Sequence, residues 1–314
     1  MLVLLTIVCA MLGWFGWEMN RARQQKVVVD WVGQMRGSVI YEQKVELLEW
    51  LSWCLDRDLF ASVVQVRLIS RRSQVTDVSP LAQLTELKTL NLSNTQVIDV
   101  TPLAALTGLE RLNLNNTQVA NLTPLAELTG LKGLELNNTQ VTDLKPLAKL
   151  TNLTRLTLDS TPVADISPLL GLVKLNSLIL SNTQVKDLSH MVNLTSLHDL
   201  SLLHTQVDDV TVLAELTNLH QLNLHSTQVA DVSPLAGSKR LHTLVLTNTP
   251  LNDVSPLAHL ASLRRLFLIH TQVNEATVKQ LRIALPECVI KWSPTDSNIP
   301  FGTDGPGTGS PFGN

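Results

Sequence analysis

The amino-acid sequence predicts an α/β repeat solenoid, with parallel strands on one face and short helical or 3₁₀ turns on the other. The first observation is the composition: the 314-residue chain has 61 leucines but only 4% aromatic residues. Between Ser62 and Lys291 the only aromatic residue is Phe267, whereas large rings dominate the core of an ordinary globular domain. The second observation is a strict period, because an aliphatic residue recurs every 22 residues from Val75 to Val273 without insertion or deletion.

A short strand is the first expected element of each repeat, which reads L-x-x-L-x-L-x-N-T-x-V-x-D-V-S-P-L-A-x-L-T-x from Leu87 as position 1. Leu90 and Leu92 are spaced for one face of a strand, so Asn91 between them must face the other way. One repeat buries too little apolar surface to offset the entropy of ordering it, whereas stacked repeats share a core. We therefore expect about 10–11 parallel strands in a sheet roughly 45–50 Å long.

The turns are expected to rest on three recurrent polar positions. Ser-Pro and Thr-Pro pairs such as Ser79-Pro80 are interpreted as an N-cap followed by the first residue of a turn on the convex side. The threonine at position 9, for example Thr95, is predicted to bond backbone groups where the chain bends. The aspartate at position 13, for example Asp99, is predicted to accept local N–H groups rather than to bind calcium.

These residues carry a family resemblance. The 22-residue pattern is similar to the short bacterial leucine-rich repeat of internalins and many bacterial surface proteins, and it covers residues 63–291. The N-terminus also resembles that of membrane-anchored leucine-rich repeat proteins from planctomycete-type bacteria. Position 9 departs from the commoner pattern, which has asparagine there. The resemblance implies a leucine-rich repeat solenoid with its parallel β-sheet on the concave face.

The first segment, residues 1–19, is predicted to be a transmembrane anchor or an uncleaved signal-anchor. Residues 1–17 carry no charge and as a helix would span about 25–28 Å. A cleaved signal peptide and a lipoprotein acylated at Cys9 remain alternatives. We therefore expect a single-pass membrane protein. The side of the repeat domain stays open, because the basic residues after the anchor favour the cytoplasm but an upstream start would reverse that.

A cap is expected at the N-terminal end of the solenoid. Residues 20–62 are predicted to form a helical juxtamembrane region and N-terminal cap, because the first coil has an open core that must be covered. Its parts are a helix that ends before Gly37, a strand at Ser38–Tyr41 and an amphipathic helix over residues 44–56.

The solenoid itself is expected over residues 63–291, as about 10–11 repeats. It ends in a longer helix at Ala276–Leu285 and a closing strand at residues 285–292. Residues 292–314 form a tail rich in proline and glycine that is predicted to be disordered. Within the solenoid, Ser238 replaces a leucine at position 20, which predicts a local weak point or bend.

Several kinds of chemistry find no support in the sequence. A net charge of −3 and a pI of about 6.2 leave no electrostatic footprint for nucleic acid. Neither a P-loop, a nucleophile elbow, a zinc-protease helix nor paired cysteine spacing occurs. We therefore expect no enzyme, no cofactor and no small-molecule substrate, and an unknown protein as partner.

The outward strand positions 3, 5 and 7 are the candidate contact surface, because they vary without disturbing the core. They are polar in the N-terminal half and mixed in the C-terminal half. Exposed apolar clusters often mark a partner site, although coverage by the tail, or no role at all, are alternatives. The candidate binding residues are Ile179, Leu203, Val245, Arg265, Phe267 and Ile269.

All eight histidines lie between residues 190 and 270. His198, His220 and His242 occupy position 2 of consecutive repeats, so they should stack about 4.8 Å apart. Neighbouring imidazoles invite a metal site or a pH-sensitive patch. Three residues in a line do not converge on one ion, however, so solvated surface histidines are the favoured interpretation.

Two functions follow as hypotheses. The first is a non-catalytic, membrane-anchored protein-binding or scaffold module that uses the concave face. The alternative is a structural envelope or adhesion protein whose polar Asn/Thr face is the contact surface.

Overall fold

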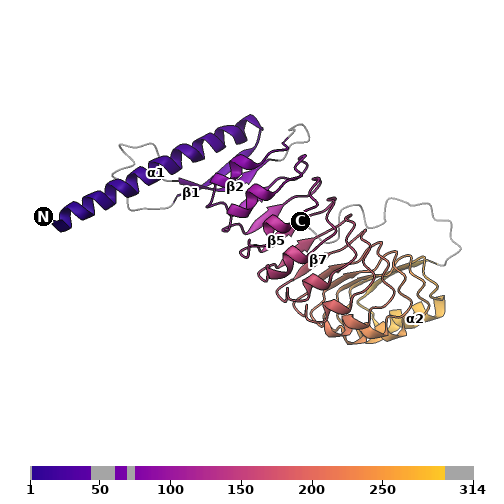
Figure 1. Cartoon of the computed structure of the whole chain (residues 1–314). Coiled ribbons are helices and arrows are strands. Elements are labelled where there is room, and N and C mark those ends of the chain that lie inside the picture. The colour runs from indigo at the N-terminus through magenta and orange to yellow at the C-terminus, as the bar shows by residue number, and fades with distance from the viewer. Residues whose placement is uncertain (1, 44–60, 69–74, 294–314) are drawn as a thin grey trace. The chain divides into compact units, whose positions relative to one another are not determined.

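The computed structural model describes residues 2–43, 61–68 and 75–293 (Figure 1). The chain divides into two compact units, Met1–Leu131 and Lys132–Asn314. The amphipathic helix expected over residues 44–56 and nearly all of the C-terminal tail lie outside the described residues.

The first unit is a parallel sheet with an antiparallel strand and a long helix at its N-terminal end. Strand β1 pairs antiparallel with β2, and β2, β3 and β4 follow in parallel. A 3₁₀ turn follows each of the last three strands. The elements are α1 (Leu2–Gln34), β1 (Ser38–Gln43), β2 (Ala61–Arg67), η3 (Ser79–Gln83), β3 (Thr89–Asn91), η4 (Thr101–Ala105), β4 (Arg111–Asn113) and η5 (Thr123–Leu125).

Helix α1 packs on this unit through its C-terminal part. Val28 and Val32 are buried, and the Gln25 amide bonds strand β2 by donating to the Ala61 carbonyl at 2.9 Å and accepting the Val63 N–H at 3.1 Å. The helix ends near the predicted stop, because Arg36 adopts a left-handed φ of 58°. The following residue is Gly37, where a Cβ would lie 2.5 Å from a Leu68 methyl.

Helix α1 is one continuous element across the two segments expected there, the anchor and the helix of the N-terminal cap. The prediction of a transmembrane anchor over residues 1–19 finds no support. Over residues 2–43, 61–68 and 75–293, no helix combines the length and the apolar character needed to cross a membrane.

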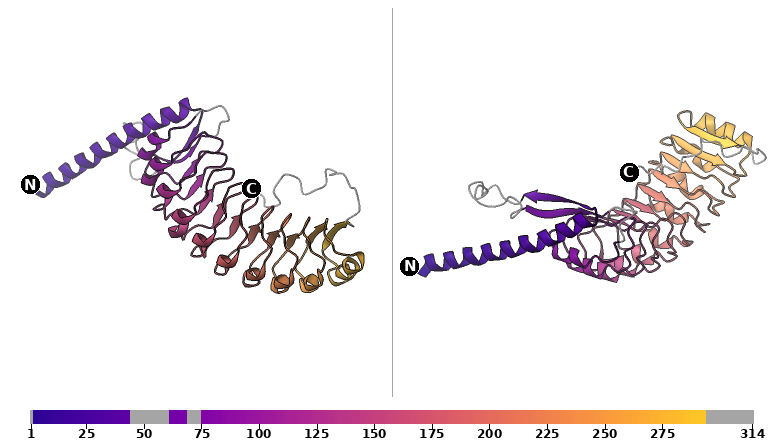
Figure 2. Two further views of the ribbon diagram at one scale, coloured as in Figure 1. Left: turned by 45° about the vertical axis from the view of Figure 1, so that its right-hand side comes forward. Right: turned by 90° about the horizontal axis from the view of Figure 1, so that it is seen from above.

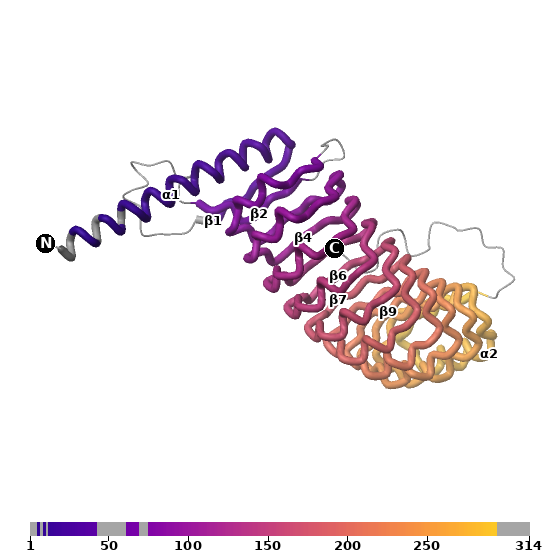
Figure 3. The backbone as a smooth tube through the Cα atoms, viewed as in Figure 1, coloured from indigo at the N-terminus to yellow at the C-terminus, as the bar shows by residue number. Residues whose placement is uncertain are grey.

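The second unit is a regular stack of coils that forms a parallel sheet in chain order (Figures 2 and 3). Each strand pairs with the same repeat position of the next, so Leu222 lies beside Leu244. The strands are β5 (Gly133–Glu135), β6 (Arg155–Thr157), β7 (Ser177–Ile179), β8 (Asp199–Ser201), β9 (Gln221–Asn223), β10 (Thr243–Val245), β11 (Arg265–Ile269) and β12 (Val289–Ser293).

Turns and one helix return the chain from strand to strand. The 3₁₀ turns are η6 (Lys145–Lys149), η7 (Ser167–Leu169), η8 (Ser189–Met191), η9 (Thr211–Glu215), η10 (Ser233–Gly237) and η11 (Ser255–His259). Helix α2 (Glu275–Ala284) replaces the last turn and is capped by Asn274, whose side chain accepts the Thr277 N–H at 2.9 Å. Helix α2 and strand β12 confirm the predicted longer helix and closing strand.

The core consists of aliphatic side chains at positions 1, 4, 6, 11, 14, 17 and 20. In the repeat that begins at Leu197, each of these residues has an exposed fraction of at most 1%: Leu197, Leu200, Leu202, Val207, Val210, Leu213 and Leu216. The narrow interior between coils is filled by these chains. This confirms the predicted aliphatic solenoid core.

The threonine at position 9 fixes the bend after each strand. Thr95 is buried, and its hydroxyl donates to the Leu92 carbonyl at 2.6 Å. The same bond recurs in nine repeats at 2.6–2.8 Å. The predicted structural role of these threonines is confirmed. The bond is made within one repeat, to the residue three positions earlier.

The residue before each threonine adopts a left-handed conformation that was not predicted from the sequence. At position 8, φ lies between 54° and 62° in nine repeats. Asparagine tolerates this region better than most residues, which explains Asn94 and its equivalents. Ser160, His204, Ser226 and His270 adopt it as well. The asparagine at position 8 of the repeat was the signal for this turn.

The aspartate at position 13 supplies the cap that was assigned to serine or threonine. Asp99 accepts the Thr101 N–H at 2.8 Å and its hydroxyl at 2.5 Å. Thr101 is the first residue of η4, and Val100 stands in the N-cap place without a side-chain bond. The prediction that Ser or Thr is the N-cap is therefore wrong. The N-cap residue is the one before it, and the capping bond comes from the aspartate two residues before it. The predicted bonding of aspartate to local N–H groups is confirmed.

Ser238 keeps the turn geometry of the leucines that it replaces. Its φ and ψ are −78° and 62°, against −90° and 60° at Leu216. The predicted bend is therefore absent. The side chain is 2% exposed and its hydroxyl has no hydrogen-bond partner, so the site combines a missing leucine with an unpaired buried hydroxyl.

We expect Ser238→Leu to raise the free energy of unfolding by about 1–3 kcal/mol, because it buries an aliphatic chain and removes the unpaired hydroxyl. Urea denaturation followed by circular dichroism measures the change. Ser238→Ala is the matched control, since it removes the hydroxyl without filling the space, and its gain should be smaller. A less stable leucine variant would show that the coil has no room there.

We also expect acid to weaken the solenoid. Hydrogen bonds from the Thr101 hydroxyl and N–H lower the pKa of Asp99, and Thr211 does the same for the pKa of Asp209. A carboxyl with a lowered folded pKa contributes stability that is present above about pH 4 and lost as pH falls through the folded value. The urea midpoint should therefore fall between pH 5 and pH 3.

The double variant Asp99→Asn/Asp209→Asn tests this cause. Its amide oxygens still accept the N–H groups but do not titrate in this range. The variant should lose less of its urea midpoint between pH 5 and pH 3 than the parent chain does. An equal loss would show that these carboxyls do not contribute.

Candidate functional site

The candidate site lies on the strand side of the second unit. Residues at positions 4 and 6 point into the core, so positions 3, 5 and 7 point away from it. We call the surface formed by positions 3, 5 and 7 of β5–β12 the strand face. It contains all six predicted binding residues.

The structure separates these six residues into two groups. Ile179 lies on β7 and Leu203 just after β8, and both are half-buried. Val245 on β10 pairs in register with Phe267 on β11, next to Ile269 and Arg265. Strand β9 lies between the two groups. The β10–β11 group is the more compact candidate.

Val245 was predicted to be exposed, and this prediction is wrong. It lies on the strand face, but its exposed fraction is only 4%. Its register partners are Asn223 on one side and Phe267 on the other. Since neighbouring strands are about 4.8 Å apart, these longer side chains cover the short valine. Val245 therefore forms the floor of the group, below Phe267.

Phe267 keeps a half-buried position on the strand face. The Lys291 ammonium on β12 lies 5.9 Å from the centre of its ring, within cation–π range. Ile269 is half-buried two residues further along the same strand. Together these residues place an accessible apolar surface beside a positive charge.

The histidines at position 2 stack as predicted. The ring centroids of His198 and His220 are 4.9 Å apart with planes at 21°, and those of His220 and His242 are 5.3 Å apart with planes at 4°. We call these three residues the histidine row. It runs along one edge of the strand face, directly before strands β8, β9 and β10.

A hydrogen bond orients each ring of the histidine row. The Nδ1 atoms lie 2.6–2.8 Å from the carbonyl oxygens of Ser196, Asn218 and Arg240, each two residues earlier. A carbonyl oxygen only accepts, so the Nδ1 atoms of His220 and His242 carry a proton and these neutral rings keep their acceptor at Nε2. The Nδ1 of His198 also lies 2.7 Å from the Asn176 amide nitrogen. The parallel rings hold these Nε2 atoms side by side. Across the described ranges no group of three or more His, Cys, Asp or Glu is arranged to hold a metal ion.

Burial shifts the pKa of one titratable group at each edge of the strand face. Burial raises the pKa of Asp199 on β8, against the opposing effects of His198, Arg155 and His220. At the other edge of the strand face, burial lowers the pKa of His225, and His204 and His270 add to this. The two edges of the face therefore differ in their electrostatics.

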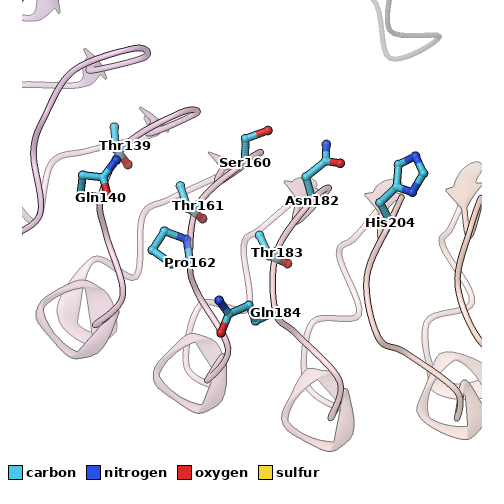
Figure 4. Close-up of a pocket in the computed structure, with 9 residues that line it drawn as sticks. All are labelled: Thr139, Gln140, Ser160, Thr161, Pro162, Asn182, Thr183, Gln184 and His204. Atoms are coloured by element: carbon cyan, nitrogen blue, oxygen red, sulfur yellow. The ribbon is translucent and has the colours of Figure 1, made fainter.

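A shallow hollow opens beside the turns that follow β5–β8. Its lining residues stand in rows on successive coils and do not converge on one point (Figure 4). The lining consists of Thr139, Gln140, Ser160, Thr161, Pro162, Asn182, Thr183, Gln184 and His204. The lining carries hydroxyl and amide groups and one imidazole, that of His204.

Two further arginines, which were not predicted as site residues, lie near Arg265. Arg264 occupies position 2 in the repeat after His242, and Arg240 lies at position 22 beside the same row. We call Arg240, Arg264 and Arg265 the rim cations. The signal for Arg264 was its place at position 2, one repeat after His242.

The stacked coils and the strand face define the class of protein as a leucine-rich repeat protein. The sequence profile of the family described as Leucine Rich repeats (2 copies) matches residues 85–127, 129–171 and 217–259. No curated protein gives a significant match.

Solved structures narrow the class. The internalin InlF of Listeria monocytogenes is 29% identical with a TM-score of 0.62, over 71% of this chain and 74% of the internalin. Internalin C2 of the same bacterium is 34% identical with a TM-score of 0.55, over 59% of this chain and 80% of that protein. The chain belongs to the internalin-like leucine-rich repeat proteins of bacteria.

A plant ectodomain shares the fold alone. The leucine-rich repeat ectodomain of the Arabidopsis thaliana membrane receptor kinase GASSHO1/SCHENGEN3 is 22% identical with a TM-score of 0.62. The match covers 77% of this chain and 32% of that ectodomain, whose structure is a complex with Casparian strip integrity factor 2.

Proposed function

We propose that the protein is a non-catalytic module that binds a protein partner through the strand face of its second unit. The observation that carries this proposal is the β10–β11 group. Phe267 and Ile269 stand half-buried on the outer face, at positions where other repeats mostly carry asparagine, serine or threonine. A hydrophobic centre of this kind, edged by arginines, is what protein interfaces use as an anchor.

The family supports the proposal. Leucine-rich repeat proteins are generally non-catalytic binding modules, and the plant ectodomain holds its factor in a complex. The rigid parallel sheet presents side chains without loop movement, which lowers the entropic cost of association.

The alternative function as a structural or adhesion element receives less support. It requires the asparagines of the polar face to contact a partner. Asn91 instead accepts the Ser93 N–H at 2.9 Å, and Asn113 accepts the Asn115 N–H at 2.9 Å. These amides hold the local backbone after the strand, which is sufficient reason for their presence.

Membrane association of residues 1–19 is a separate proposal, with the side of the repeat domain left open. It rests on the uncharged run over residues 1–17 and on the exposure of several large apolar side chains in this segment. The exposed side chains in this segment include Leu5, Leu12, Trp14 and Trp17.

Phe267→Ala should weaken capture of the native partner about tenfold or more, because truncating an anchor aromatic removes most of its contact area. Crosslinking in cells followed by quantitative mass spectrometry measures the capture. Ile283→Ala is the matched control, since Ile283 is an 81% exposed apolar residue on α2 outside the strand face. Equal capture by both variants, with unchanged circular dichroism, would contradict a site at Phe267.

Leu5→Asp/Leu12→Asp should move the protein from the membrane fraction to the supernatant, because charges in an apolar anchor disfavour insertion. Ultracentrifugation after a high-salt wash measures the distribution. Val27→Asp is the control, since Val27 is an exposed residue of the same helix outside residues 1–19. A parent chain that is already found in the supernatant would overturn the membrane proposal.

A further inference from the structure

We infer that the partner segment recognised here is acidic, and that it binds along the edge of the strand face formed by the histidine row and the rim cations, more tightly as pH falls. The inference rests on the proposed function and names the chemistry of the partner at that site. It goes beyond the apolar group, because it assigns the contact to charged side chains of the neighbouring edge.

The edge is continuous from coil to coil. The His220 N–H donates to the His198 carbonyl at 2.8 Å, the His242 N–H to the His220 carbonyl at 2.8 Å, and the Arg264 N–H to the His242 carbonyl at 2.9 Å. Four cationic or protonatable side chains therefore follow one another along adjacent strands, about 5 Å apart. A segment with several carboxylates laid along this edge meets one of them at each step.

The rim cations are bonded only to neutral groups. Arg240 donates to the Asn218 amide oxygen at 2.6 Å, Arg264 to the Ala261 carbonyl at 2.8 Å and Arg265 to the Thr243 hydroxyl at 3.2 Å. In the part of the chain that the structure covers, none of the three has a carboxylate within 4.0 Å. Their full charge is therefore available to an anion from outside.

Cations elsewhere in the described residues are of both kinds: Arg155 donates to the Ser177 hydroxyl at 3.4 Å and Lys174 to the Asn152 amide oxygen at 2.7 Å. Lys186 pairs with Asp208 at 3.1 Å and Lys279 with Glu275 at 3.0 Å, so other exposed cations do have carboxylate partners. What distinguishes the edge is that three arginines and three histidines lie together on it, in a chain whose net charge is −3. Local potential of one sign attracts and orients a partner of the opposite sign.

The histidine row adds a dependence on pH. His220 and His242 hold a proton at Nδ1 through a carbonyl, so a second proton binds at Nε2, and each ring of the row becomes positive when it takes a second proton. Three such charges about 5 Å apart repel one another, and an anion laid across them relieves that repulsion. Because the acidic segment binds the charged rings better, its affinity rises as pH falls between about 7.5 and 5.5.

The charged groups around the row set its limits. Asp199 lies at the β8 end, with Arg155 beyond it, and Arg240 and Arg264 lie at the β11 end. At neutral pH the arginines carry the binding, and at lower pH the histidines join them.

An acidic protein segment fits this edge better than nucleic acid does. Phe267 is the only Phe, Tyr or Trp in the sequence between Ser62 and Lys291, so the repeats lack the succession of large aromatic rings on which single-stranded nucleic acid stacks. Nucleic-acid binding also requires a broad basic footprint, which the overall charge lacks.

The experiment titrates the full-length chain into a fluorescein-labelled peptide of ten aspartates, at pH 7.5 and pH 5.5 and fixed salt, and follows the anisotropy. We expect the dissociation constant to fall about tenfold between the two pH values, from three added surface charges of modest effect each. Binding that is absent at both pH values, or that is unaffected by pH, would overturn the inference.

Two variants assign the effect. His198→Gln/His220→Gln/His242→Gln keeps neutral donors at the row, so it should bind as the parent does at pH 7.5 and lose the gain at pH 5.5. Arg264→Gln/Arg265→Gln should weaken binding at least fivefold at both pH values. His259→Gln is the matched control on η11, away from the strand face, and should change neither value. A pH gain that survives the triple variant would contradict the inference.

Competing occupants are distinguished by further probes at the same salt. Tighter binding of a single-stranded ten-nucleotide DNA, or of vesicles containing phosphatidylserine, than of the aspartate peptide would overturn the assignment to an acidic protein segment. If capture of the native partner depends on Phe267 but not on Arg264, Arg265 or pH, the proposed function stands and this inference fails. If capture depends on none of them, both fail.

Discussion

The narrow space between stacked coils is the constraint on which the rest of the structure depends. Seven aliphatic side chains per repeat fill it, and their exposed fractions in the repeat from Leu197 are at most 1%. An aromatic ring does not fit into this space, which explains why Phe267 lies on the outer face. The same constraint fixes the strand register, because each leucine must meet its equivalent in the next coil.

Strict register turns sequence positions into spatial rows. The threonine hydroxyls, the left-handed residues and the aspartate caps each recur at one position. The threonines and aspartates bond backbone groups of their own turn. At the outer positions, asparagines make such bonds, as when Asn91 accepts the Ser93 N–H, but the residue type varies from repeat to repeat. Side chains such as His220 and Arg264 therefore lie in ordered lines on a rigid sheet, and the lines give the surface its electrostatic character.

The period and the leucine pattern were enough to predict the solenoid, helix α2 and strand β12, because the core decides them. The cap of each turn was harder to assign, since Asp99 and Thr101 both favour turn starts and only the geometry shows that the carboxylate accepts the N–H. The burial of Val245 depends on the length of Asn223 and Phe267 across the sheet, which a single repeat does not reveal. The edge with Arg240 and Arg264 required reading several repeats together.

The unbroken register has a consequence for how such a chain grows or shrinks. Duplicating or deleting one whole coil keeps every row of side chains in line. Adding a single residue within a coil would turn a leucine outward and end each row at that point. A lineage can therefore lengthen the histidine row by copying the coil around His220, without redesigning any core contact. The length of this edge can therefore change only in steps of one coil.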